Sequence, residues 1–258
     1  MNGLALQTYE MARRSVLQTM RQPAMIIPPI LFPLILMGIN VSGLDAATMI
    51  PGFPTDSYLD FAIAFPFVQG ALFASINAGS AVARDVETGF LNRLALTPMQ
   101  RAAMLLGHLA GVMVVALISG VIYLTVGFAA GLHFESGPFG VVVLFLLALL
   151  IALAFASLGA FIGLRTGSGE AVQGVFPLFF VFLFLSSSSL PRNLIEHDWF
   201  RIIATYNPIS YLFEGLRSLI LFGWQAQALE LGFGFAASIA LIGIVGSVGA
   251  LRTRLART

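Results

Sequence analysis

The sequence predicts an all-α membrane protein with six transmembrane helices and both termini in the cytoplasm. Its 258 residues are 58% hydrophobic and 10% charged, whereas soluble domains carry about 25% charged residues. Six long apolar runs are separated by segments that hold nearly all of the charge, and arginines gather in every second segment. The formal net charge of +1 gives no overall field that would attract nucleic acid.

The six runs are long enough to cross a bilayer, because a spanning helix needs about 20 mainly apolar residues. No Asp, Glu or Arg lies in the middle of a run, where one would cost roughly 2.5–3.5 kcal/mol on insertion scales. We therefore expect one membrane domain at 23–251, an amphipathic interface helix before it at 1–22, and a cytoplasmic tail after it at 252–258. The runs cover residues 24–42, 59–82, 104–132, 139–164, 172–190 and 228–251.

The arginines predict the orientation of these spans. One set of connecting segments carries ten arginines and four acids, and the opposite set carries three arginines and eight acids. Because positive charge is retained on the cytoplasmic side, we expect both termini there. All 13 basic residues are arginine, a bias typical of GC-rich bacteria, so we expect a multi-pass protein of a bacterial inner membrane. The ten arginines are Arg13, Arg14, Arg21, Arg84, Arg93, Arg101, Arg165, Arg252, Arg254 and Arg257, and the three are Arg192, Arg201 and Arg217.

Residues 4–21 predict an amphipathic helix that ends before Pro23. Glu10 and Arg14 are spaced for an i,i+4 ion pair. Such a helix would lie along the cytoplasmic membrane surface, and a frayed leader is the alternative. The charges in this segment argue against a cleaved signal peptide. Its apolar positions at helical spacing are Ala5, Tyr9, Ala12, Val16 and Met20.

Uncharged features distinguish the spans. The first contains Pro28, Pro29 and Pro33, where a helix can bend. The second carries a polar face, which lines either a substrate path or a contact with another helix. The fifth is rich in phenylalanine and faces lipid or the core. That polar face is made by Gln69, Phe73, Asn77 and Ser80, and close helix packing is predicted at Gly107/Gly111, Gly127/Gly131 and Gly159/Gly163.

The segment after the second run, residues 84–98, reads RDVETGFLNRLALTP. Pro98 would end a helix here. Apolar side chains on an aqueous face need a cover, either the lipid surface or a partner protein. Both covers remain open from this pattern alone. The apolar stripe consists of Val86, Phe90, Leu91 and Leu94.

A second apolar segment, Ile209 to Phe222, is only 14 residues long and therefore too short to span. A pair of helices that dips into the outer leaflet would suit it, and Asn207-Pro208 would form the turn that begins it. Glu214 and Arg217 are spaced i,i+3 and could form an ion pair.

Several chemistries are missing from the sequence. There is no G-x-x-x-x-G-K-[ST], no H-E-x-x-H and no G-x-S-x-G, and there is no cysteine. We expect no catalysis, metal or cofactor in this chain. Among Asp, Glu, His and Arg, the group that qualifies as lying within a run is His108, near the cytoplasmic end of the third run. It could relay protons or simply be a hydrogen-bonded structural group.

Two stretches carry a family resemblance. Residues 84–98 resemble the segment R-D/E-x-E-x-G-T-L-E-R-L-x-x-T-P of ABC type-2 transporter permeases. Leu190-Pro191 and the later string YNPISYLFEGLR at 206–217 resemble that family's L-P … x-N-P-L-T-Y-x-x-E-x-x-R. The resemblance extends over essentially the whole chain, although Phe90 and Asn92 replace the commoner Thr and Glu.

The resemblance implies a dimer, formed with a second copy or a sister permease, in which each half binds a separate ATP-binding subunit. ATP and magnesium would belong to those two subunits. Residues 84–98 would be the coupling helix, with a second contact at Arg165 and Glu170. The implied coupling residues are Arg84, Asp85, Glu87, Phe90, Leu91, Arg93 and Leu94, and the implied outer re-entrant residues are Asn207, Pro208, Tyr211, Glu214 and Arg217.

The expected function is the permease subunit of an ATP-driven exporter, of the daunorubicin-resistance type, that moves an amphipathic drug-like or lipid-like compound. Apolar spans without buried charge suit such a cargo. Export of a polysaccharide or another cell-envelope precursor is the alternative within transport. A non-transporting membrane scaffold and a secondary transporter that depends on His108 are the alternatives from other classes.

Overall fold

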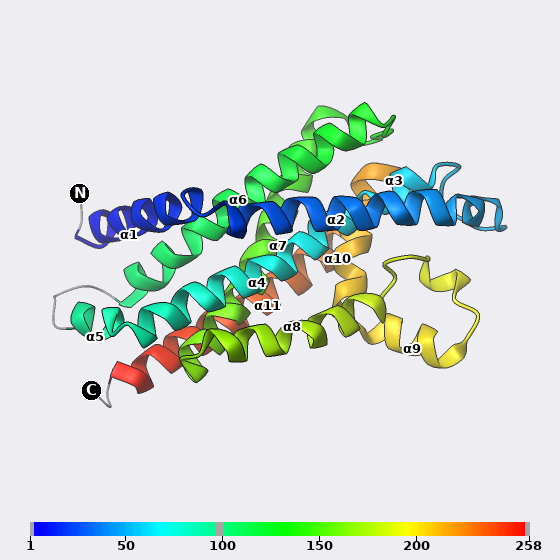
Figure 1. Cartoon of the computed structure of the whole chain (residues 1–258). Coiled ribbons are helices and arrows are strands. Elements are labelled where there is room, and N and C mark those ends of the chain that lie inside the picture. Colours follow the sequence, from blue (N-terminus) through cyan, green and yellow to red (C-terminus); the bar gives the residue numbers. More distant parts are fainter. Residues whose placement is uncertain (1–2, 96–100, 256–258) are drawn as a thin grey trace.

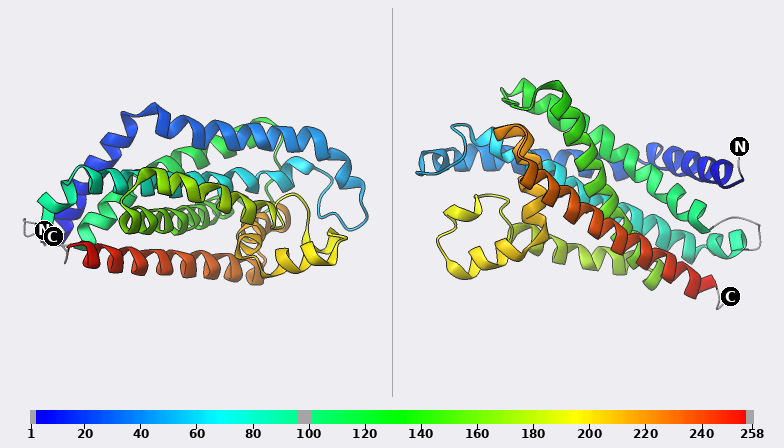
Figure 2. Two further views of the ribbon diagram at one scale, coloured as in Figure 1. Left: turned by 60° about the horizontal axis from the view of Figure 1, so that its bottom comes forward. Right: turned by 180° about the vertical axis from the view of Figure 1, so that it is seen from behind.

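The computed structural model describes residues 3–95 and 101–255, and every regular element within those ranges is a helix. This confirms the all-α prediction. The long helices run between two ends of an elongated bundle (Figure 1). One end holds the start of α1 (Gly3–Met20) and the finish of α11 (Ala226–Leu255), and we call it the terminal end (Figure 2). We call the opposite one the far end.

Five helical stretches are long and apolar enough to cross a membrane: Ile26–Met49, Tyr58–Glu87, Ala103–Ala129, Gly137–Thr166 and Ala226–Arg254. They match five of the six expected runs. The elements that build them are α2 (Pro23–Leu44) with η1 (Asp45–Met49), α3 (Tyr58–Ala62) with α4 (Ala64–Glu87), α6 (Arg101–Ala129), α7 (Gly137–Thr166) and α11.

The run expected at 172–190 is a shorter helix, α8 (Gly169–Phe184). Its 16 residues extend about 24 Å at 1.5 Å per residue, which is less than the roughly 30 Å of a hydrocarbon core. The chain leaves the helix before the Ser186–Ser189 run. The sixth span is therefore not established by helix length. The remaining elements are α5 (Phe90–Ala95), η2 (Arg192–Leu194), α9 (Asp198–Tyr206), α10 (Pro208–Arg217) and η3 (Ser218–Phe222).

Helix α4 lies at the centre of the bundle. In the most apolar part of its span 78% of the residues are buried, against 17% for the first span. It packs against α7 most extensively, and also against α2, α6 and α8. Its less buried positions include Phe73, Asn77 and Ser80 of the predicted polar face, so other helices of this chain cover that face only in part.

Glycines set the closest helix contacts. A methyl group on Gly159 would lie 1.8 Å from the carbonyl oxygen of Ser75, and one on Gly163 would lie 2.3 Å from that of Gly79. These distances are far below van der Waals contact, so α7 approaches α4 this closely only because both positions lack a side chain. The predicted packing role of this pair is confirmed.

The other two glycine pairs differ. A methyl on Gly107 would lie 2.2 Å from Cβ of Met11, and one on Gly111 would lie 2.5 Å from Oγ of Ser15, so this pair receives α1. Gly127 packs 3.0 Å from Ile63 by the same measure. The prediction is wrong for Gly131, which has φ +96° and no neighbour within 4 Å, because it forms the turn after α6.

Helix α1 forms over nearly the predicted range and packs along the first half of α6 (Figure 1). The predicted Glu10–Arg14 pair is wrong. Glu10 instead lies 3.9 Å from Nη1 of Arg13, and Arg14 turns towards Asp85 on α4. The i,i+4 spacing allows a pair but does not favour it over a more deeply buried carboxylate.

A hydrogen bond from α6 replaces one that a proline removes from α2. Pro33 has no N–H, so the carbonyl of Pro29, four residues earlier, lacks its normal helical partner. The buried hydroxyl of Tyr123 on α6 donates a hydrogen bond to that carbonyl. The bend-prone part of α2 is therefore held against α6.

The segment expected to hold two outer re-entrant helices is divided differently. Helix α9 begins at Asp198, before the expected segment, and helix α10 with η3 fills residues 208–222. Asn207 joins them: its Oδ1 accepts from Ile209 N at 3.0 Å and caps α10. Its Nδ2 donates to the carbonyls of Phe182 at 2.6 Å and Leu185 at 3.0 Å, at the end of α8.

Candidate functional site

The predicted coupling segment lies at the terminal end, where α4 stops and α5 begins (Figure 1). Gly89 has φ +67°, a left-handed conformation that an α-helix cannot continue through. Thr88 Oγ1 donates to the carbonyl of Arg84 at 2.9 Å and closes the last turn of α4. Helix α5 follows over only six residues. The side chain of Leu94 and residues 96–98 lie outside the part of the chain that the structure describes.

The structure brings the two predicted coupling segments together. Oε1 of Glu87 accepts a hydrogen bond from the backbone N of Gly169, at the start of α8, at 3.3 Å. Ser168 caps the same helix end by accepting from Ala171 N. Charged side chains from both segments are exposed around this junction, and we call them the charged rim. The charged rim consists of Arg84, Glu87, Arg93, Arg165 and Glu170.

An arginine from the C-terminal part of α11 also reaches this surface. Arg254 Nε donates to the carbonyl of Leu164, near the end of α7, at 3.0 Å. This contact joins residues 90 positions apart. The sequence assigned Arg254 only to a tail of basic residues, and nothing in its local pattern indicates a partner on α7.

The apolar stripe of the coupling segment is covered largely by the chain itself. Leu91 is buried in a cluster with residues of α6, α7 and α11, and Val86 packs against that cluster. Phe90 is half-buried beneath the guanidinium of Arg14, whose central carbon lies 4.1 Å from the ring centroid. Leu91 therefore anchors α5 instead of facing outward, and the exposed part of this surface is charged.

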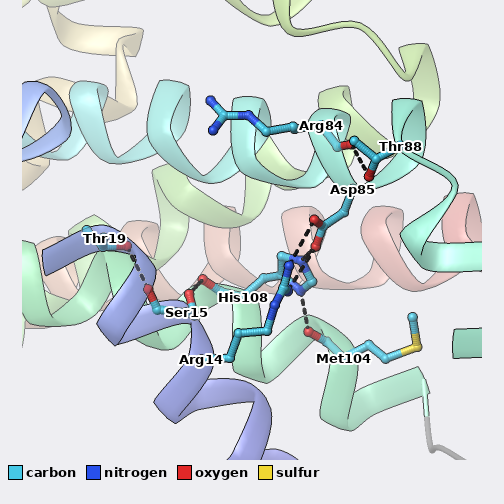
Figure 3. Close-up of polar contacts among 8 residues, drawn as sticks. All are labelled: Arg14, Ser15, Thr19, Arg84, Asp85, Thr88, Met104 and His108. Atoms are coloured by element: carbon cyan, nitrogen blue, oxygen red, sulfur yellow. Dashed lines mark hydrogen bonds and ion pairs between the residues drawn. The ribbon is translucent and has the colours of Figure 1, made fainter. Parts of the chain in front are cut away.

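Asp85, expected at the same interface, is buried and lies in a cluster of charges (Figure 3). Arg14 of α1 donates from Nη1 to Oδ2 and from Nη2 to Oδ1, both at 3.2 Å. Nε2 of His108, on α6, lies 2.6 Å from Oδ2. Three helices thus contribute one charged group each, and we call these three residues the clasp. His108 is accordingly a hydrogen-bonded group of the fold.

Both ring nitrogens of His108 have partners. Nδ1 lies 2.7 Å from the carbonyl of Met104, one turn earlier on α6, and Nε2 lies 2.6 Å from Oδ2 of Asp85. The two contacts hold the ring between its own helix and α4.

The predicted polar face of the second span does not act as one surface. Gln69 is fully buried. Phe73 packs against Phe32 of α2 and Phe176 of α8. Asn77 borders two small cavities of about 20 Å³ and about 30 Å³, which lie between α4 and α6. Each has room for about one or two waters, so neither could hold a drug-sized molecule.

A larger hollow of about 560 Å³ lies at the far end, bordered by Arg192, Glu214 and Arg217. The predicted Glu214–Arg217 pair is wrong: Glu214 Oε2 lies 2.6 Å from Nη2 of Arg192. Burial raises the pKa of Glu214, and the charge of Arg192 partly offsets that shift. Tyr211 lies beneath Arg192 and donates from its hydroxyl to the carbonyl of Thr205 at 2.9 Å.

Arg217 is buried and bonded to backbone alone. Its Nε donates to the carbonyl of Phe61 at 3.0 Å, Nη1 to that of Ser187 at 2.5 Å, and Nη2 to that of Ser188. Burial lowers the pKa of Arg217 to about 9, so the guanidinium stays charged at neutral pH. It ties α10 to α3 and to the segment after α8.

Comparisons with known proteins identify relatives. The family model described as ABC-2 type transporter matches residues 6–221. A relative from Pyropia yezoensis, named as the transport permease ycf38, is 29% identical over 212 residues, which cover 80% of this chain and 71% of the relative.

Two further relatives carry names that refer to drug resistance. One from Mycobacterium tuberculosis, named as a doxorubicin resistance ABC transporter permease, is 24% identical over 157 residues, covering 59% of this chain and 56% of the relative. One from Streptomyces coeruleorubidus, named as a daunorubicin resistance ABC transporter permease, is 23% identical over 172 residues, which cover 64% of this chain and 59% of the relative.

Proposed function

The chain belongs to the ABC-2 type transporter family, and from that premise we propose that it is the membrane permease subunit of an ATP-driven exporter. It is a multi-pass membrane protein with several helices able to span a bilayer. The motor is a separate ATP-binding subunit, which holds ATP and magnesium. The lack of a P-loop motif in this sequence agrees with that division of labour.

The proposed orientation places the terminal end in the cytoplasm of a bacterium, on the charge bias of the connecting segments. Helix α8 then acts as the sixth span, and the Ser186–Ser189 run completes the crossing. Helices α9 and α10 form the outer re-entrant pair. Two features support this: α10 is largely buried among the spans, and Asn207 fixes it to the end of α8.

The charged rim is the proposed docking surface for the ATP-binding subunit. The observation that carries this assignment is the hydrogen bond between Glu87 and Gly169, which joins two segments 82 residues apart into one exposed polar surface. Beneath it, Leu91 is buried and fixes α5 to the bundle, and Asp85 is buried near the end of α4. A movement of the charged rim would therefore be transmitted directly to α4, the central helix.

The working unit is proposed to contain two ATP-binding subunits and a second permease, either a copy of this chain or a sister chain. The two cavities beside α4 are too small for an amphipathic drug. A path formed between two permeases avoids this limit. Drug-like or lipid-like cargo is supported by the names of the doxorubicin and daunorubicin resistance relatives and by the uncharged middle of the spans.

The test is to purify the tagged chain gently from its native membrane and to identify what accompanies it. We expect a stoichiometric P-loop ATPase with vanadate-sensitive hydrolysis. Glu87→Ala and Arg93→Ala should leave the chain folded while hydrolysis no longer drives export. Asp198→Ala, an exposed change at the far end, is the matched control and should export normally.

Two outcomes would contradict the proposal. If the chain is isolated without any nucleotide-hydrolysing partner under mild conditions, it is a scaffold or a secondary transporter. If the complex forms but both rim variants export as well as the unaltered chain, the docking surface lies elsewhere.

A further inference from the structure

We propose that the clasp of Arg14, Asp85 and His108 makes α1 a working part of the coupling machinery, because it sets the position of α5 relative to α4. This inference rests on the proposed exporter function. It assigns Arg14 and His108 as positioning residues, since neither is expected to touch ATP or cargo.

The clasp acts on both sides of the break between α4 and α5. The guanidinium of Arg14 bonds the carboxylate of Asp85, near the end of α4, and lies over the ring of Phe90, the first residue of α5. Between these two residues stands the left-handed Gly89, at the turn from α4 into α5. One side chain from α1 therefore contacts the chain on both sides of this turn.

The carboxylate of Asp85 is held by charge-assisted contacts at both of its oxygens. Both oxygens of Asp85 accept from Arg14, and Oδ2 also accepts from His108. Charge-assisted bonds of this kind are shorter and about twice as strong as neutral ones. Breaking a buried pair on one side costs more than the pair contributes, because the remaining charge stays buried.

The partners differ in how easily they can leave. The side chain of Asp85 is 9% exposed and that of Arg14 is 38% exposed. Arg14 also borders an open depression of about 500 Å³ lined by other residues of α1. It can therefore release into water while Asp85 remains with His108. Transmission of a motion through the α4–α5 junction requires two arrangements of it, here clasped and released.

His108 holds the carboxylate from a third helix. Its Nε2 lies 2.6 Å from Oδ2 of Asp85, and its Nδ1 lies 2.7 Å from the carbonyl of Met104. The contact between α6 and Asp85 can therefore remain when Arg14 leaves the carboxylate.

The experiment uses the complete complex of permease and ATPase in proteoliposomes, with doxorubicin as the fluorescent probe. Export and ATP hydrolysis are measured together, and complex yield is measured separately. Arg14→Gln and Asp85→Asn should each lower export per ATP about tenfold while the complex still assembles. The double variant should be no worse than Asp85→Asn alone, because Asp85→Asn already removes the ion pair that Arg14→Gln removes. Arg13→Gln is the matched control on α1, since the ion pair found for Arg13 among the described residues is an exposed one with Glu10, at 3.9 Å.

The ratio of export to ATP hydrolysis, measured beside complex yield, is a readout that a purely structural role would not move. His108→Gln, which keeps a donor for Asp85, should retain export per ATP close to that of the unaltered complex. Unchanged export per ATP in Arg14→Gln, or a loss confined to assembly, would each overturn the proposal. Failure of the unaltered complex to form or to hydrolyse ATP would instead overturn the proposed function.

Discussion

Replacing Arg217 with methionine tests whether a buried cation holds the far end together. Methionine keeps an unbranched apolar stem but has no donor, so the carbonyls of Phe61, Ser187 and Ser188 lose their partner. Burying an unpaired carbonyl costs roughly 1–3 kcal/mol. Part of this loss is recovered because a charge no longer has to be desolvated. The net expected loss is about 3–5 kcal/mol.

This loss is large enough to measure by thermal unfolding in detergent. For a chain of this size about 1 kcal/mol corresponds to about 2–4 °C in Tm, so Arg217→Met should melt about 6–20 °C lower. Arg217→Lys should fall in between, since an ammonium group is a point charge and cannot match a planar fork aimed at three carbonyls.

Arg201→Met is the control, because Arg201 is about half exposed and its ion pair with Asp198 lies on the surface. It should stay within about 1 °C of the unaltered chain. If Arg217→Met also melts within about 2 °C of the unaltered chain, then the three carbonyls do not depend on the guanidinium, and the assignment of Arg217 as the far-end anchor is wrong.

Three further changes have expected outcomes of their own. Gly159→Leu should abolish the folded, monodisperse protein in size-exclusion chromatography, since a methyl there already overlaps an α4 carbonyl, while Gly174→Ala, which meets no atom within 4 Å, should elute normally. Tyr123→Phe strands the carbonyl of Pro29 and should lower stability by about 1–3 kcal/mol in a thermal assay. The raised pKa of Glu214 means that the folded state binds more protons just above the ordinary value of 4.5. Stability from this group should therefore be fully present at low pH and fall as the pH rises above about 4.5, and Glu214→Gln should lack that fall.

The sequence predicted most of the fold because membrane insertion depends on features that are local in sequence. A run of about 20 apolar residues is sufficient to identify a span, and five of the expected six were found. Glycine spacing identified the α4–α7 contact for the same reason, since Gly159 and Gly163 stand one helical turn apart. The run at 172–190 extends past Phe184, where α8 ends and four serines follow Leu185, so helix length does not establish this span.

The partners of charged residues could not be predicted in this way. Arg14 has a possible partner in Glu10, four residues away, but it bonds Asp85, which is 71 residues away. Glu214 likewise pairs with Arg192 instead of with Arg217. Sequence spacing identifies possible ion-pair partners on the same helix. The partner that is found also depends on which charged groups of other helices are buried nearby. The same reason explains Leu91, whose apolar character predicted a cover without indicating that the chain's own buried cluster supplies it.

Arg14 at the terminal end and Arg217 at the far end each fix the position of a helix that does not span the membrane. Apolar surfaces in lipid give little preference for one helix position over another, because lipid tails solvate them equally well. The short helices α1 and α10 do not span and therefore need a directional contact to fix their position. Arg14 supplies it for α1 through Asp85, and Arg217 supplies it for α10 through three carbonyls. The difference lies in the partner: Arg217 is enclosed and bonded to backbone, which suits a fixed anchor, whereas Arg14 is partly exposed and shares its carboxylate with a histidine, which suits a contact that opens and closes.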